Sequence, residues 1–194
     1  MKFDNLVEEL LESTSPLRTL YHITKMANAA NIISTDKFEL AEQDESGEQL
    51  FPKFKNYLST ARGLTSSYIK GKINLTMDKV LVIFELNASA LSDKGYVIKP
   101  MNDFLEIDDV ENLELEDRIL TNKPFINNAK SFIKTINLLH PANFLDTFSQ
   151  SGVRKAYSIN DAYKIFKDSG IPTFVFSSIK AFSLLDKRKA KLLK

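Results

Sequence analysis

The chain has no cysteine and no tryptophan, and it contains only two histidines, six glycines and six prolines in 194 residues. The lack of cysteine excludes disulfide bonds, thiolate nucleophiles and thiolate metal sites. Because the chain has no cysteine and only two histidines, we expect no zinc site and no other bound metal. Glycine-rich phosphate loops of the P-loop and Rossmann spacings are also absent, so neither nucleotide-binding site is supported.

Long hydrophobic runs are missing as well. No apolar stretch approaches the roughly 18 residues that a membrane-spanning helix needs. Residues 1–5 (MKFDN) contain one lysine and then an acid, which is unlike a signal peptide. We therefore expect no membrane association, and a cytoplasmic location, in a bacterium or in a host cell, is the simplest interpretation.

Length and composition are those of an ordinary globular protein. Hydrophobic residues make up 43% of the chain and charged residues 26%, which predicts a single domain over residues 1–194. The charge is unevenly divided. Residues 1–117 carry 12 Lys or Arg and 21 Asp or Glu, a net charge of −9, whereas residues 118–194 carry 14 and 4, a net charge of +10. This asymmetry fits either an anionic partner for the C-terminal third or mutual neutralisation of the two halves.

Hydrophobic periodicity predicts alternating strands and helices. The nearly continuous apolar run Val80–Phe84 indicates a strand buried on both faces. Residues 42–49 are the longest polar stretch and predict a loop. We expect strands at 17–24, 37–40, 57–60, 79–86, 96–99, 113–120 and 171–177, and helices at 5–13, 27–34, 65–70, 129–139 and from Ser158 to a stop signal at Gly170.

Two sequence blocks in the first half combine polar groups with tyrosines. Residues 20–24 (LYHIT) predict a strand that places a histidine beside a hydroxyl group. Residues 57–62 (YLSTAR) predict a second strand, and Thr65 and Tyr68 follow on the expected helical turn. The two tyrosines of this second block are 11 residues apart.

A third block is acidic. Residues 114–118 (ELEDR) end a segment, 103–117, in which 8 residues are Asp or Glu. If the block forms a strand, Glu114 and Glu116 share one face and Asp117 points to the other. Taken alone, each block could consist of core-packing residues or of a solvated strand edge. The order and spacing of the three blocks together favour a functional interpretation.

The three blocks, in this order, resemble the histidine–tyrosine–glutamate branch of the ADP-ribosyltransferases, which includes diphtheria-type toxins and poly(ADP-ribose) polymerases. The resemblance covers about residues 18–120. It implies an ADP-ribosyltransferase fold of the α/β (α+β) class, in which two packed, mainly antiparallel sheets surround an NAD cleft and helices flank them. The NAD-binding core would span about 17–120 and a basic helical C-terminal part about 121–194.

The resemblance also implies a role in binding NAD+ for three residues of each tyrosine-containing block. The histidine and threonine of the first block would hydrogen-bond the adenosine ribose. The residue between them is isoleucine where poly(ADP-ribose) polymerases have glycine, and its backbone would contact the nicotinamide carboxamide. The two tyrosines would enclose nicotinamide, and the threonine before the second would bind its carboxamide. These residues are His22, Ile23, Thr24, Tyr57, Thr65 and Tyr68.

The catalytic residues implied by the resemblance are Glu116, His22 and Tyr57. Glu116 would face the oxocarbenium ion that develops as the bond to nicotinamide breaks, since a carboxylate stabilises such a cation most in a water-poor site. Glu114 matches the acid that orients the acceptor in arginine-modifying members. Which of Glu114, Glu116 and Asp117 is the catalytic acid stays open.

The expected activity is mono-ADP-ribosyl transfer: NAD+, as a substrate, is cleaved at the nicotinamide bond and ADP-ribose passes to a protein or nucleic acid acceptor. The abundance of Lys, Asn, Ile and Phe points to an AT-rich bacterial or phage genome, hence to a toxin, defence or phage effector role with an antitoxin or inhibitor as a further partner. The alternatives are an RNA 2′-phosphotransferase of the same fold and an inactive module that binds nucleic acid or an acidic protein.

Overall fold

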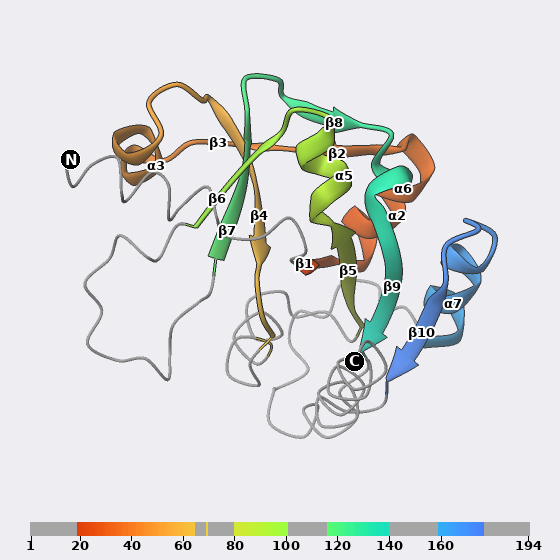
Figure 1. The fold of residues 1–194 in the computed structure, drawn as a ribbon. Helices are drawn as coiled ribbons and strands as arrows, with labels where there is room; N and C mark the ends of the chain where they lie inside the picture. Colours follow the sequence, from red (N-terminus) through yellow and green to blue (C-terminus); the bar gives the residue numbers. More distant parts are fainter. Residues whose placement is uncertain (1–18, 65–68, 70–79, 101–115, 140–158, 177–194) are drawn as a thin grey trace, which may run out of the picture.

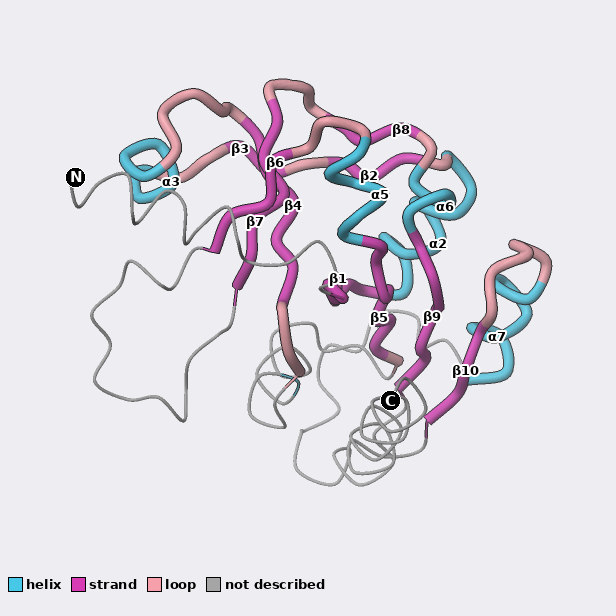
Figure 2. Tube along the Cα trace, viewed as in Figure 1, coloured by secondary structure: helices cyan, strands magenta, loops and turns pink. Residues whose placement is uncertain are grey.

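The computed structural model describes residues 19–64, 69, 80–100, 116–139 and 159–176. These residues form a mixed α/β structure on one large, mainly antiparallel sheet with few helices (Figures 1 and 2). The expected mixed class with mainly antiparallel strands is therefore confirmed. In the part of the chain that the structure describes, no helix is long and apolar enough to cross a membrane.

Eight strands make up the large sheet. They are β1 (Thr19–Lys25), β3 (Ala41–Glu42), β4 (Asn56–Ala61), β5 (Leu81–Asn87), β6 (Val97–Pro100), β7 (Glu116–Thr121), β9 (Ile133–Leu139) and β10 (Thr173–Phe176). Their order is β10-β9-β5-β1-β4-β7-β6, with β3 paired to β4. Neighbouring strands are antiparallel except for β9 and β10. A separate two-stranded sheet joins β2 (Lys37–Glu39) to β8 (Phe125–Asn127).

Among the described residues, five helices connect or cover these strands. They are α2 (Met26–Thr35), α3 (Glu45–Leu50), α5 (Ala88–Asp93), α6 (Ala129–Phe132) and α7 (Ile159–Lys167). Helix α2 buries Met26, Ala29, Ile32 and Ile33, whose spacing forms one helical face. Gly170, with a positive φ of 76°, follows α7 as the expected stop signal.

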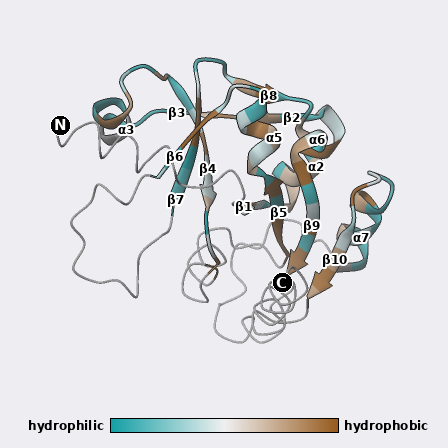
Figure 3. Ribbon diagram, viewed as in Figure 1, coloured by the Kyte–Doolittle hydropathy of each residue, from teal (hydrophilic) through white to brown (hydrophobic). Residues whose placement is uncertain are grey.

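The main core lies on one face of the large sheet. It contains Leu20 of β1, Phe84 of β5, Leu58 of β4 and Ile119 of β7, together with the buried faces of α2 and α7. On the opposite face the apolar residues form two separate clusters. One surrounds Tyr21, Ile83 and Leu139, and the other surrounds Tyr57, Phe51 and Leu120. The tips of β9 and β10 are hydrophobic, whereas the start of β7 is hydrophilic (Figure 3).

Most expected elements are confirmed to within a few residues. They are the strands expected at 17–24, 37–40, 57–60, 79–86, 96–99, 113–120 and 171–177 and the helices expected at 27–34 and after Ser158, within the described residues. The helix expected at 5–13 lies outside the described residues, as does all but Ile69 of the turn expected at 65–70.

Three expectations are wrong. The helix expected over 129–139 ends at Phe132, and residues 133–139 form β9 instead. This segment pairs with β5 on one side and β10 on the other, so its backbone hydrogen bonds and buried β-branched residues favour a central strand. Because β8, β9 and β10 all lie beyond residue 121, the C-terminal part is not simply helical. The loop expected at 42–49 contains α3, whose first turn is capped by Asp44 through a 2.8 Å bond from the Gly47 amide.

Candidate functional site

The strands that carry the three sequence blocks lie side by side. In the sheet, β1 with His22 is next to β4 with Tyr57, and β4 is next to β7 with Glu116 (Figure 1). These strands come from residues 19–25, 56–61 and 116–121, so the fold brings together segments nearly 100 residues apart in the chain. The three blocks, which are separated in the sequence, thus lie on neighbouring strands of the sheet.

One row of residues crosses all three strands. Tyr21 pairs with Ala61, and Ala61 pairs with Glu116. Tyr21 and Ala61 are the single paired position between β1 and β4, whereas β4 and β7 are paired along six residues. The sheet is therefore continuous at this row and β1 separates from β4 beyond it.

His22 spans the place where these two strands separate. Its Nδ1 donates a hydrogen bond to the backbone carbonyl oxygen of Ser59 in β4, at 2.9 Å. Because a carbonyl oxygen can only accept, Nδ1 carries the proton of this hydrogen bond. The half-buried ring also stacks against Phe84 at 6.4 Å and meets the edge of Phe38 at 5.8 Å, centroid to centroid.

The alternation of side chains separates His22 from Glu116. Paired residues share a face, so Glu116 lies on the face of Tyr21 and Ala61, and His22 lies on the main-core face with Asp117. Strand β4 stands between the histidine ring and the Glu116 carboxylate. The structure thus places the two expected catalytic residues on the strands that flank β4, on opposite faces of the sheet and not in contact.

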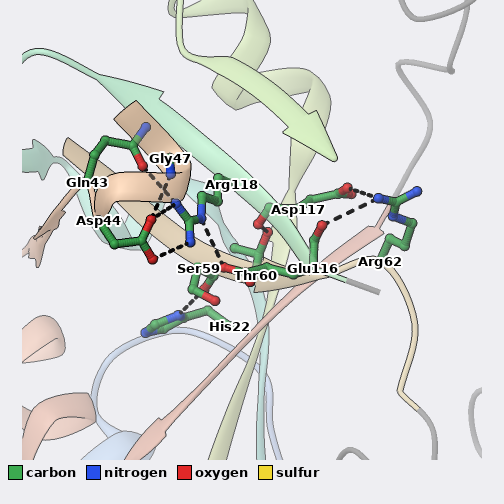
Figure 4. Close-up of polar contacts among 10 residues, drawn as sticks. All are labelled: His22, Gln43, Asp44, Gly47, Ser59, Thr60, Arg62, Glu116, Asp117 and Arg118. Atoms are coloured by element: carbon green, nitrogen blue, oxygen red, sulfur yellow. Dashed lines mark hydrogen bonds and ion pairs between the residues drawn. The ribbon is translucent and has the colours of Figure 1, made fainter. Parts of the chain in front are cut away.

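A buried arginine organises the face that carries Glu116. Arg118 Nε donates to Glu116 Oε1 at 3.3 Å, and its two terminal nitrogens donate to the two oxygens of Asp44, each at 3.2 Å (Figure 4). The same guanidinium donates to Gln43 Oε1 at 2.9 Å and lies 4.0 Å from the ring centre of Tyr57. We refer to Gln43, Asp44, Tyr57, Glu116 and Arg118 as the Arg118 cluster.

Close packing holds the Arg118 cluster together. The Arg118 side chain is 5% exposed, that of Glu116 17% and that of Asp44 57%. A Cβ atom at Gly47 would overlap the Gln43 amide and the Arg118 guanidinium, so only glycine permits their close approach to α3. The cluster therefore joins β4, β7 and the start of α3 through one charged side chain.

The charges of the cluster shift the pKa values of three side chains. The hydrogen bonds from Arg118 and from the Gly47 amide lower the pKa of Asp44 below its ordinary value. Burial opposes the charge of Arg118, but the hydrogen bond to Asp44 and the nearby Glu116 outweigh it and raise the Arg118 pKa. Burial also raises the pKa of the Tyr57 hydroxyl, so the phenol is neutral at physiological pH.

Arg118 constrains the role expected of Tyr57. The guanidinium covers one face of the Tyr57 ring in a cation–π contact, and Phe51, Phe54 and Leu120 pack in the same small cluster. Only the opposite ring face could stack on nicotinamide. The structure therefore gives Tyr57 a packing function whether or not it also contacts a ligand.

Asp117 is paired with a second arginine. Arg62 Nη2 forms an ion pair with Asp117 Oδ1 at 2.9 Å and donates a hydrogen bond to the backbone carbonyl oxygen of Glu116 at 3.4 Å. Asp117 is 2% exposed, and its backbone carbonyl accepts a 2.7 Å bond from the Thr60 hydroxyl. This carboxylate is buried and neutralised, whereas Glu116 is the more accessible of the two described acids. Of the two, Glu116 is the better placed to meet a ligand.

Of the remaining expected site residues, two lie in β1 and three lie outside the described residues. Thr24 is buried in β1, and Ile23 is half-buried beside Tyr21 on the face opposite His22. Thr65, Tyr68 and Glu114 lie outside the described residues. Within the described ranges, no three His, Cys, Asp or Glu side chains are grouped so that they could hold a metal ion.

Gln43, Asp44 and Arg118 are the cluster residues that sequence reasoning missed. Asp44 could have been predicted as a helix cap, because aspartate is common at the position just before a helix, where its side chain accepts from a backbone amide of the first turn. The cap was missed because residues 42–49 were expected to form a loop. Arg118 had a weaker signal, a charge followed by the apolar pair Ile119-Leu120.

Comparisons with known proteins do not assign a family to this chain. No protein-family model matches it, and a search of curated proteins gives no significant match.

Proposed function

We propose that this protein is an NAD+-dependent mono-ADP-ribosyltransferase with the ADP-ribosyltransferase fold. One observation carries the proposal: the strands with the histidine, tyrosine and glutamate blocks are three consecutive strands of one sheet. The proposed substrates are NAD+ and a protein or nucleic acid acceptor, and the proposed setting is a bacterial toxin, defence or phage effector system.

Each described residue has a chemical role in this proposal. Glu116, which is partly exposed on one side of β4, faces the oxocarbenium ion that forms as nicotinamide leaves. His22, held through Nδ1 by the Ser59 carbonyl, presents Nε2 toward a ribose hydroxyl. The bond between nicotinamide nitrogen and ribose carbon breaks with its electron pair moving to nicotinamide, and a nucleophilic atom of the acceptor then bonds to that carbon.

The described arginines do not favour the alternative of an RNA 2′-phosphotransferase. That reaction needs cations to hold a phosphate group. Arg118 already donates to Asp44, Gln43 and Glu116, and Arg62 is paired with Asp117. Both cations are thus neutralised by carboxylates of the chain itself, so ADP-ribosyl transfer is the activity that we propose.

Turnover of labelled NAD+ tests the proposal. The purified protein is incubated with NAD+ labelled in the nicotinamide ring or in the adenylate, with cell lysate as the source of acceptor. We expect free labelled nicotinamide and a labelled macromolecule. Nicotinamide release that requires 2′-phosphorylated RNA would instead indicate phosphotransfer, and tight NAD+ binding with no release would indicate an inactive binding module.

A Glu116→Gln variant tests the assignment of the catalytic acid. A carboxylate that acts on the developing cation contributes in the transition state, so kcat should fall by about 10²–10³ while NAD+ affinity stays near that of the wild type. Glu48→Gln, a change of an exposed acid in α3, is the matched control. Near-normal turnover of Glu116→Gln would refute this assignment, and Glu114→Gln would then be the next variant.

A further inference from the structure

The carboxylate of Glu116 depends on one neighbour for its orientation. Within the described part of the chain, Arg118 is the side chain that hydrogen-bonds it, through Nε and Oε1 at 3.3 Å. Glutamate has a long, rotatable side chain, so a single restraint has a large effect on where its oxygens lie. The two residues are two positions apart on β7 and share a face, which keeps their side chains parallel.

Arg118 is itself held from three other directions. Its fork meets both oxygens of Asp44, Gln43 accepts from it, and Tyr57 lies against its plane. The Gln43 oxygen accepts from Arg118, whereas the Gln43 amide nitrogen is buried and has no hydrogen-bond partner among the described residues. Asp44, in turn, is fixed by the first turn of α3.

We propose that Arg118 is the positioning residue of the site, and that the chain of contacts from α3 through Asp44 and Arg118 sets the orientation of the Glu116 carboxylate. This inference rests on the proposed function, since it concerns the acid that faces the cleaved bond. Arg118 is too enclosed to contact NAD+ itself, with 5% of its side chain exposed. It therefore acts through Glu116.

The Arg118→Lys variant is the first test. Lysine keeps the positive charge but has no planar fork, so it cannot reach Asp44 and Glu116 together. We expect kcat for NAD+ hydrolysis to fall by about 10- to 100-fold, because a displacement near 1 Å has that effect on a reacting group. The KM for NAD+ should stay unchanged, whereas a purely structural defect would lower the amount of NAD+-binding protein, which calorimetric stoichiometry measures.

Asp44→Asn is the second test and does not depend on the stability of the first variant. Asparagine caps a helix as well as aspartate does, and the Asp44 side chain is 57% exposed, so this variant keeps α3 and loses only the ionic contact to Arg118. We expect a several-fold decrease in kcat with an unchanged KM. Glu48→Gln, on the same helix, should retain wild-type kinetics.

A double-mutant cycle with Glu116→Gln makes the test decisive. If Arg118 acts only through Glu116, Arg118→Lys should lower kcat in the wild-type background and have no further effect in the Glu116→Gln background. Equal losses in both backgrounds would overturn the inference, as would wild-type kcat in both Arg118→Lys and Asp44→Asn. A wild-type protein that releases no nicotinamide would overturn the proposed function and, with it, this inference. The two failures can be told apart, because the outcomes above overturn the inference in a protein that still releases nicotinamide.

Discussion

The two halves of the large sheet, on either side of the β1–β4 junction, achieve burial by different means. The half formed by β5, β9 and β10 packs Ile83, Leu139 and Phe176 on its outer face. The half formed by β4, β7 and β6 packs a smaller apolar cluster there and inserts the Arg118 cluster beside it. Apolar contact has little directional preference, whereas a guanidinium with four partners specifies positions. The first half therefore supplies stability, and the second supplies a defined arrangement of polar groups.

The largest expected effect comes from the apolar half. Leu139→Ala in β9 removes a fully buried side chain of the outer-face cluster and should lower the free energy of unfolding by about 2–5 kcal/mol. Since no charge is involved, the loss should be the same at pH 7 and at pH 4. Urea unfolding at both pH values measures it. A loss that changed strongly with pH would show that the two halves are not separable in this way.

Arg118→Met should have the next largest effect. It leaves the partly buried Glu116 and the exposed Asp44 without their cation, and because Asp44 is largely solvated we expect a loss of about 1–3 kcal/mol, below that for a fully buried pair. Urea unfolding beside Arg118→Lys separates charge from geometry. A stability equal to or above that of the wild type would indicate that the arginine serves function at the expense of stability.

Two substitutions of Asp44 separate its cap from its charge. Asp44→Ala removes both and should cost about 0.5–2 kcal/mol, the usual range for a lost N-terminal cap. Asp44→Asn removes only the charge and should cost about 0.2–1 kcal/mol, as for other exposed ion pairs. Thermal unfolding of both variants beside the wild type checks the order. Equal losses in the two variants would mean that the charge carries the whole effect.

The smallest expected effect is a pH dependence confined to the polar half. The folded-state pKa of Asp44 is below its ordinary value of 3.8, so the ionised carboxylate stabilises the fold above that value. This stabilisation should disappear as the pH falls through the lowered pKa. The difference in melting temperature between wild type and Asp44→Asn should therefore be constant from pH 7 to about pH 5 and shrink below about pH 4. A difference at pH 3 that was undiminished from its value at pH 7 would contradict this linkage.

Residue pattern predicts some elements of the fold better than others. The continuous run at Leu81–Phe84 favours a buried strand, and the spacing of Met26, Ala29 and Ile33 favours one helix face, as the structure confirms. By contrast, β9 carries apolar residues that fit a helical spacing as well as a strand, and only its position between two partners decides between them. Hydrophobic periodicity indicates which residues are buried, but it does not by itself indicate which strands pair with one another.

The polar site shows the same limit. The sequence blocks predict that His22, Tyr57 and Glu116 belong to strands, and the structure confirms those three strands as neighbours. Which side of β4 each residue occupies depends on register, and a shift of one residue would reverse it. The contacts of Arg118 with Gln43 and Asp44 join positions about 75 residues apart, and nothing in local pattern reports a contact of that separation.

The hydrogen bond from His22 to the Ser59 carbonyl has a consequence for mutational screens. Because β1 and β4 share one paired position, the imidazole replaces a missing rung of the ladder at the place where the strands diverge. If a mutational screen recovered only histidine at position 22, the result could therefore reflect the hydrogen bond between β1 and β4 as well as a role in catalysis. His22→Asn, which retains an N–H donor but no ring nitrogen lone pair, separates the two: it should preserve the strand junction and lose whatever Nε2 does.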